Sequence, residues 1–173
     1  MASKNAGSAR KGKATELLIA AIAVLATDGE LNALTAMVDD EGVDLGFKRR
    51  NGSRTLDVQV KARFSDEGGS KKLREEGIFV SDVREETFRP REELWMLFAA
   101  IDGRNADLQT AWLVPSVRFD EKAFRVKVNG KPHVRFQASV KQSSDDKWRP
   151  FRLSRAQFPA KLLEVVESLD PKP

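Results

Sequence analysis

The sequence predicts an α+β (α/β) fold, in which an N-terminal helix packs on a mixed central β-sheet with added strands and a C-terminal helix. Three observations predict it. An apolar helical segment follows the first residues, apolar runs separated by turn dipeptides fill the middle, and an amphipathic segment closes the chain. No repeat or domain linker interrupts this order, so we expect a basic, disordered tail over residues 1–13 and a single domain over 14–173.

The two expected helices differ in character. The first spans about Thr15 to Thr27, is apolar nearly all round and should be deeply packed, and Asp28-Gly29 ends it. The second runs from about Phe158 to Leu169 and shows one apolar face. A Ser154-x-x-Gln157 capping start precedes this second helix.

Strands are expected between these helices, because short apolar runs alternate there with turn residues. The segment 65–72 is rich in glycine, serine and charge and is expected to be a mobile loop. The predicted strands are residues 31–38, 42–47, 56–61, 78–83, 93–101, 108–114, 124–128 and 134–140.

The second and third of these strands flank Asn51-Gly52, a dipeptide typical of β-hairpin turns. If the turn is a two-residue loop, Asp44 lies directly opposite Gln59. A four-residue loop centred on the same point keeps this register, whereas a three-residue loop or a bulge shifts it by one residue.

The predicted register gives the hairpin two unlike faces. An acid, an amide and an amine together on a strand pair are groups that metal-assisted phosphodiester hydrolysis uses. The alternative is an ordinary solvated face with a cross-strand ion pair. The polar face collects Asp44, Lys48, Asp57, Gln59 and Lys61, and the apolar face collects Val43, Leu45, Phe47, Leu56, Val58, Val60 and Ala62.

Glu16 in the first helix, Asp44 in a Gly-Val-Asp-Leu strand and Gln59-Val60-Lys61 in the next strand resemble the PD-(D/E)XK nuclease superfamily. The restriction-endonuclease-like and Holliday-junction-resolvase-like members with a QxK variant are closest in style. The resemblance covers residues 14–64 by motif. It implies a restriction-endonuclease-like core and a Mg²⁺-dependent endonuclease that hydrolyses DNA phosphodiester bonds with a metal-activated water.

The resemblance also implies roles for single residues. Asp44 would be the principal ligand of Mg²⁺ or Mn²⁺, with the side-chain oxygen of Gln59 and the backbone carbonyl of Val60. Lys61 would orient the attacking water and stabilise charge on the phosphate. Glu16 would complete the metal shell through water, or would only complement the dipole of a helix that starts beside it.

One residue departs from the family pattern, because the neutral Gln59 stands where an acid is usual. Asp57, or Asp39, Asp40 and Glu41 before the Asp44 strand, could replace the missing charge. The departure keeps two alternatives open. One is a catalytically inactive nucleic-acid-binding or accessory module in a defence or mobile-element system. The other is an unrelated α+β domain whose hairpin matches by chance.

Charge gives only weak support for a nucleic-acid partner. The net charge is +4, and residues 1–13 carry four basic residues and no acid, so the rest of the chain is neutral overall. Within it, the hairpin tip is a candidate nucleic-acid-binding patch. The tip residues are Lys48, Arg49, Arg50 and Arg54.

Composition excludes several other classes. The chain has no cysteine and a single histidine, which argues against disulfides, thiol catalysis, zinc sites and a Ser-His-Asp triad. No apolar run approaches membrane-spanning length, so we expect a cytoplasmic protein without a membrane partner. Aromatic residues in 115–153 are expected in the core. A homodimer stays open, since resolvase-like chemistry needs two active sites.

Overall fold

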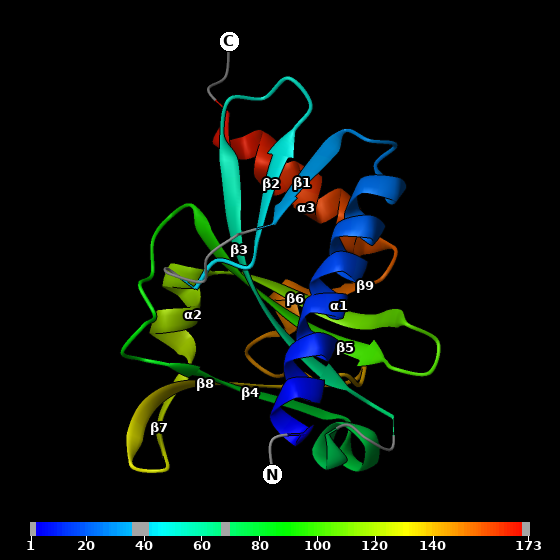
Figure 1. The fold of residues 1–173 in the computed structure, drawn as a ribbon. Coiled ribbons are helices and arrows are strands. Elements are labelled where there is room, and N and C mark those ends of the chain that lie inside the picture. The colour runs from blue at the N-terminus through cyan, green and yellow to red at the C-terminus, as the bar shows by residue number, and fades with distance from the viewer. Residues whose placement is uncertain (1–2, 36–41, 67–69, 171–173) are drawn as a thin grey trace.

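Two β-sheets and a set of helices form a layered arrangement in the computed structural model, which describes residues 3–35, 42–66 and 70–170 (Figure 1). Helices α1 (Ser3–Ala26) and α3 (Gln157–Leu169) pack on one face of the larger sheet. The smaller sheet and helix α2 (Ser116–Lys122) cover the other face. The predicted fold class is confirmed, with an N-terminal helix on a mixed central sheet, added strands and a C-terminal helix.

The larger sheet is mixed because β3 pairs parallel with β5, whereas its other neighbouring strands pair antiparallel. Its strand order is β1-β2-β3-β5-β6-β9, and the order in the smaller sheet is β4-β8-β7. The strands of the larger sheet are β1 (Leu31–Thr35), β2 (Leu45–Arg49), β3 (Thr55–Phe64), β5 (Leu94–Asp102), β6 (Asp107–Pro115) and β9 (Arg152–Ser154). Those of the smaller sheet are β4 (Ile78–Arg84), β7 (Phe124–Val128) and β8 (Lys131–Ser139).

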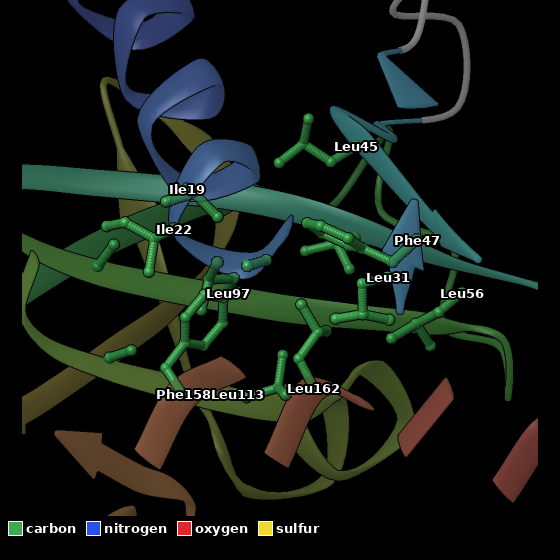
Figure 2. Close-up of a cluster of buried hydrophobic side chains, with 14 of the residues drawn as sticks. Ile19, Ile22, Leu31, Leu45, Phe47, Leu56, Leu97, Leu113, Phe158 and Leu162 are labelled. Carbon is green, nitrogen blue, oxygen red and sulfur yellow. The ribbon is translucent and has the colours of Figure 1, made fainter. Parts of the chain in front are cut away.

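The first core lies between α1, α3 and the larger sheet, and Figure 2 shows part of it. Ile19 of α1 and Phe158 and Leu162 of α3 are fully buried against strand residues such as Leu97. Burying a side chain of this size contributes about 1.5–3 kcal/mol. These contacts fix α1 on the sheet, and α1 also carries Glu16.

The second core is aromatic and joins the smaller sheet to the larger one. Phe98 of β5 stacks on Phe136 of β8 with ring centroids 3.8 Å apart and an interplanar angle of 9°. Trp112 and Phe79 pack on the same rings. The expectation of core packing holds for Phe119, Phe136 and Trp148, which are buried, whereas Phe124 is 53% exposed.

The hairpin register is confirmed. Leu45 pairs with Val58 and Phe47 with Leu56, which is the register that puts Asp44 level with Gln59. Pairing ends at Lys48, opposite Thr55. The connection is therefore longer than the predicted two-residue loop, but it is centred on the same point.

Helix α1 differs most from its prediction, because it begins at Ser3 and not near Thr15. Residues 3–13, expected as a tail, continue the same helix. Glu16 thus lies far from the first turn, where a carboxylate interacts with the helix dipole. This placement removes the dipole explanation for Glu16, while the division into tail and single domain stays a prediction.

Other elements follow the prediction more closely. The capping start of α3 is confirmed, because the Ser154 N–H donates to Gln157 Oε1 at 3.0 Å and the Gln157 N–H donates to Ser154 Oγ at 3.3 Å. Residues 36–38 of the first predicted strand lie outside the described residues. In place of part of the predicted loop, a short π-helix spans Lys72–Glu76. Helix α2 and strand β9 were not predicted.

None of the helices described is long and apolar enough to cross a membrane.

Candidate active site

Strand β3 has an open edge in its second half. Strand β2 pairs with it only over Thr55–Val58, whereas β5 pairs along its other edge from Asp57 to Phe64. The N–H and C=O of one residue in an extended strand face the same edge. The backbone groups of Val60 therefore face the edge that β2 has left.

Asp44 lies at this point, just before β2 begins. Its N–H donates to the Val58 carbonyl at 3.0 Å, and its carboxylate Oδ2 accepts the Val60 N–H at 2.7 Å. The Asp44 carboxylate thus accepts the hydrogen bond that a longer β2 would accept from the Val60 N–H. This bond holds the carboxylate in one position. The predicted neighbourhood of Asp44 and Val60 is present.

Gln59 lies against the backbone of Gly42. Gly42 has a φ of +69°, and a Cβ added there would lie 2.7 Å from Gln59 Nε2. Both the backbone conformation and the close approach therefore require glycine. The Gly-Val-Asp segment places the Asp44 carboxylate at Val60 and also leaves room for the Gln59 amide beside it.

Lys61 shares a strand face with Gln59, because side chains alternate along β3. It is half-buried and stands level with Phe98 of β5. Lys61 therefore extends the polar row of β3 beyond Gln59, on the half of the strand that β2 does not cover.

Glu16 approaches the same region from α1. Its side chain is 16% exposed, and its Oε2 accepts a hydrogen bond from Lys13 Nζ at 2.7 Å. This bond raises the pKa of Lys13 above its ordinary value; desolvation opposes the rise, and the negative charges of Glu16 and Asp44 add to it. Lys13 thus lies within the electrostatic range of both carboxylates, and its hydrogen bond to Glu16 links α1 to the neighbourhood of Asp44.

These donors suit a hard divalent cation. Carboxylate, amide and backbone carbonyl oxygens are the ligands that Mg²⁺ and Mn²⁺ prefer, and Mg²⁺ keeps several waters at such sites. Within residues 3–35, 42–66 and 70–170, no group of three or more acidic, histidine or cysteine side chains could hold a metal. A cation here would thus depend on Asp44 and Glu16, with the neutral oxygens of Gln59 and Val60.

Of the acids suggested as substitutes for the missing charge, only Asp57 lies within the described residues, and it is engaged by another side chain. The Asp57 carboxylate is bound to Arg91 Nη2 at 2.9 Å, with both side chains about one-third exposed. Arg91 lies before β5 and was not foreseen as its partner. Asp39, Asp40 and Glu41 lie outside the described residues.

The basic hairpin tip lies at the opposite end of the β2–β3 pair, about five residues or roughly 17 Å from Asp44 along the strand. Acids surround it. Arg49 Nε lies 3.5 Å from Glu167 and 3.9 Å from Glu30. The Asp170 carboxylate accepts hydrogen bonds from the Ser53 N–H and hydroxyl, both at 2.9 Å, and from the Arg54 N–H at 3.2 Å.

Two residues of the site were missed in the sequence. Lys13 could have been found from its i,i+3 spacing to Glu16, had the helix been predicted to start earlier. The role of Gly42 depends on its contact with Gln59, which is on another strand. No local signal in the sequence shows that contact.

Comparison with known proteins gives limited help. No protein-family model matches the chain, and no curated protein matches its sequence. Among solved structures, a bacterial homing endonuclease, I-Ssp6803I, is similar to it at 16% identity, over 87% of this chain and 90% of that chain, with a TM-score of 0.48. A likeness of this strength supports no inference about function.

Proposed function

We propose that this protein is a Mg²⁺-dependent endonuclease that hydrolyses DNA phosphodiester bonds. The observation that carries the proposal is the Asp44 carboxylate held on the Val60 N–H at the open edge of β3. Gln59 lies beside this edge, Glu16 reaches the same region from α1, and Lys61 shares the face of Gln59. An acid anchored on the backbone of a strand edge has a fixed position, which a metal ligand requires.

Asp44, Gln59 and the Val60 carbonyl would hold the cation, and Glu16 would hold one of its waters. A bound Mg²⁺ or Mn²⁺ supplies two effects: it polarises a phosphoryl oxygen and lowers the pKa of the attacking water. Glu16 is hydrogen-bonded to Lys13. Lys13 would therefore have to share or release that carboxylate when the cation binds.

Lys61 would act on the phosphate and on the attacking water. Its ammonium can donate three hydrogen bonds and carries a full charge, so it can orient the water and stabilise negative charge that develops on the phosphate oxygens. Its position on a central strand limits its movement. A fixed donor of this kind is more effective than a lysine on a loop, because it need not be ordered during the reaction.

The test is cleavage of supercoiled plasmid DNA with Mg²⁺ or Mn²⁺, compared with EDTA. Asp44→Asn and Lys61→Met should each lower the cleavage rate by about 10³-fold, the upper range for loss of one essential electrostatic group. Asp57→Asn is the matched control, because Asp57 lies on the same strand face but is paired with Arg91. Cleavage that survives in the Asp44→Asn, Lys61→Met double variant would sink the proposal.

A second function has its own supporting observation. Gln59 is neutral, and Lys13 already compensates Glu16, so the protein could use the fold for binding alone as an inactive nucleic-acid-binding or accessory module. Titration calorimetry with Mg²⁺ and Mn²⁺ separates the two functions. A saturable site that Asp44→Asn abolishes favours the nuclease, whereas the accessory module predicts no such site.

A further inference from the structure

The polar row of β3 continues past Lys61 to Arg63, which shares its face. Arg63 Nε donates to the Val80 carbonyl of β4 at 2.9 Å, and its Nη1 donates to the Ala62 carbonyl at 2.9 Å. Burial lowers the pKa of this guanidinium, and the charge of Asp82 opposes that change. Arg63 thus connects the candidate active site to β4, the edge strand of the smaller sheet.

The smaller sheet has an inner and an outer face. Its inner side chains are buried in the aromatic core, and they include Phe79 and Val83 of β4 and Phe136 of β8. Side chains on the alternate positions therefore point outward. We use "outer face" for the side that carries Asp82 and Arg84 of β4 together with Lys131, His133 and Arg135 of β8.

The outer face carries more cations than acids. Asp82 is the acid among its outward positions, and Arg135 binds it with two hydrogen bonds of 2.7 and 2.9 Å. Those bonds lower the pKa of Asp82, burial opposes them, and the charges of His133 and Arg63 lower it further. Asp82 is therefore ionised and compensated, which leaves the exposed Arg84 and Lys131 as net positive charge.

An exposed aromatic ring borders the same face. Phe124 of β7 pairs with Arg135 and so lies on the outer face, where it is 53% exposed. Lys147 Nζ lies 3.7 Å from the centre of the Phe124 ring. Lys147 therefore adds a further positive charge at the border of the face that carries Arg84 and Lys131. The Phe124 ring takes no part in either core.

We propose that the outer face of the β4–β8–β7 sheet, with Arg63, binds the sugar–phosphate backbone of duplex DNA and aligns it with Asp44 and Lys61. Charge complementarity identifies the partner, because arginine and lysine contacts to phosphates position a protein on a duplex without reading its sequence. The residues outside the first 13 are neutral overall, so the excess of cations among the outward positions of this face is not a result of composition. The alignment rests on the proposed nuclease function, whereas binding itself does not.

The test is a fluorescence-anisotropy titration of a labelled DNA duplex in EDTA, repeated over a range of KCl concentrations. The outer-face variant carries Arg84→Gln and Lys131→Gln, two exposed positions. The matched control carries Arg50→Gln and Arg54→Gln at the hairpin tip and removes the same formal charge. Circular dichroism and thermal melts check that both variants fold.

For the outer-face variant, the slope of log K against log salt should become shallower by about 1.8, since each phosphate contact contributes about 0.9. The same loss predicts at least roughly tenfold weaker binding near 0.1 M salt. The tip variant should bind within about twofold of the parent. Equal losses in the two variants, or a larger loss at the tip, would overturn the proposal, and tighter binding to an RNA duplex would overturn the assignment to DNA.

Failure of this proposal and failure of the nuclease function are distinguishable. A protein that binds DNA through the outer face but cleaves nothing with Mg²⁺ or Mn²⁺ loses the nuclease function and keeps the binding surface. If cleavage depends on Asp44 but DNA binding is unchanged in the outer-face variant, the nuclease function stands and the proposed binding surface is overturned.

Discussion

The two ends of the β2–β3 hairpin both carry charged groups but differ in what these groups contact. At the tip, Glu30 and Glu167 flank Arg49, and Asp170 accepts hydrogen bonds from the next loop residues. At the open end, β2 stops while β3 continues, and Asp44 bonds to the β3 backbone where a strand would otherwise pair. At the tip the acids lie beside Arg49 and the loop backbone, whereas at the open end a half-buried carboxylate is anchored on a strand backbone.

The cations of the tip gather in the sequence, whereas the acids beside them do not. The tip was predicted to bind nucleic acid because four cations lie close together in the sequence. The acids Glu30, Glu167 and Asp170 come from outside the hairpin, and Glu30 and Glu167 lie beside Arg49. Nucleic-acid binding by the tip stays a prediction, and the Arg50→Gln, Arg54→Gln variant tests it.

Among the variants expected to tighten metal binding, Gln59→Glu at the open end should have the largest effect. It restores the acid that the nuclease family usually has, and metal affinity rises with the charge of the ligands. We expect Mg²⁺ to bind about tenfold or more tightly by calorimetry. Glu30→Gln, a charge change at the tip, should leave that affinity unchanged. No change in affinity with Gln59→Glu would place the metal elsewhere.

Gly42→Ala tests whether the open end requires its glycine. A Cβ at Gly42 would lie 2.7 Å from Gln59 Nε2 in a backbone of φ +69°. Gly29→Ala is the matched control, with φ +73° and no atom within 4 Å of the added Cβ. Both variants carry the backbone cost of about 1 kcal/mol. Gly42→Ala should lose about 1–2 kcal/mol more in urea unfolding.

Metal titration of the two alanine variants completes this test. Only Gly42→Ala should weaken Mg²⁺ binding, because it displaces the Gln59 amide. Equal stability and equal metal affinity in the two variants would show that Gln59 moves aside without consequence.

Lys13→Met should have a smaller effect, in the direction of tighter metal binding. The Lys13 ammonium is hydrogen-bonded to Glu16 and interacts with Asp44, so it competes with a cation for both carboxylates. We expect up to about fivefold tighter Mg²⁺ binding, the upper value for an exposed ion pair in water. Lys11→Met removes the same charge from a side chain that lies over Phe64 and should have little effect.

The smallest effect is expected at the tip, from Asp170→Asn. Hydrogen bonds from Ser53 lower the pKa of Asp170 below its ordinary value of 3.8. A group with a lowered folded pKa stabilises the protein above its unfolded pKa, and this stabilisation is lost as the pH falls through the folded pKa. The urea midpoint of Asp170→Asn should therefore be slightly lower than that of the parent at pH 7. The two midpoints should converge as the pH falls below 3.8. A difference between the midpoints that stays constant with pH would contradict the predicted direction of the pH dependence.

Much of the fold could be predicted because its signals are local. The Asn51-Gly52 turn and the strand alternation around it predicted the register of Leu45 opposite Val58. Ser154 and Gln157 predicted the start of α3 by their spacing alone. By contrast, α2 has no strong periodic pattern. The basic residues among residues 3–13 hid the early start of α1.

The candidate site was predictable only in part, for a physical reason. Alternation along a strand placed Asp44, Gln59 and Lys61 on one face from the sequence alone. The partner of Asp57, the compensation of the hairpin tip by Asp170 and the approach of Glu16 to Asp44 depend on how α1, α3 and β5 pack on the sheet. So does the connection from Arg63 to the smaller sheet. These contacts join residues distant in sequence, and local periodicity carries no information about them, so only the tertiary structure decided them.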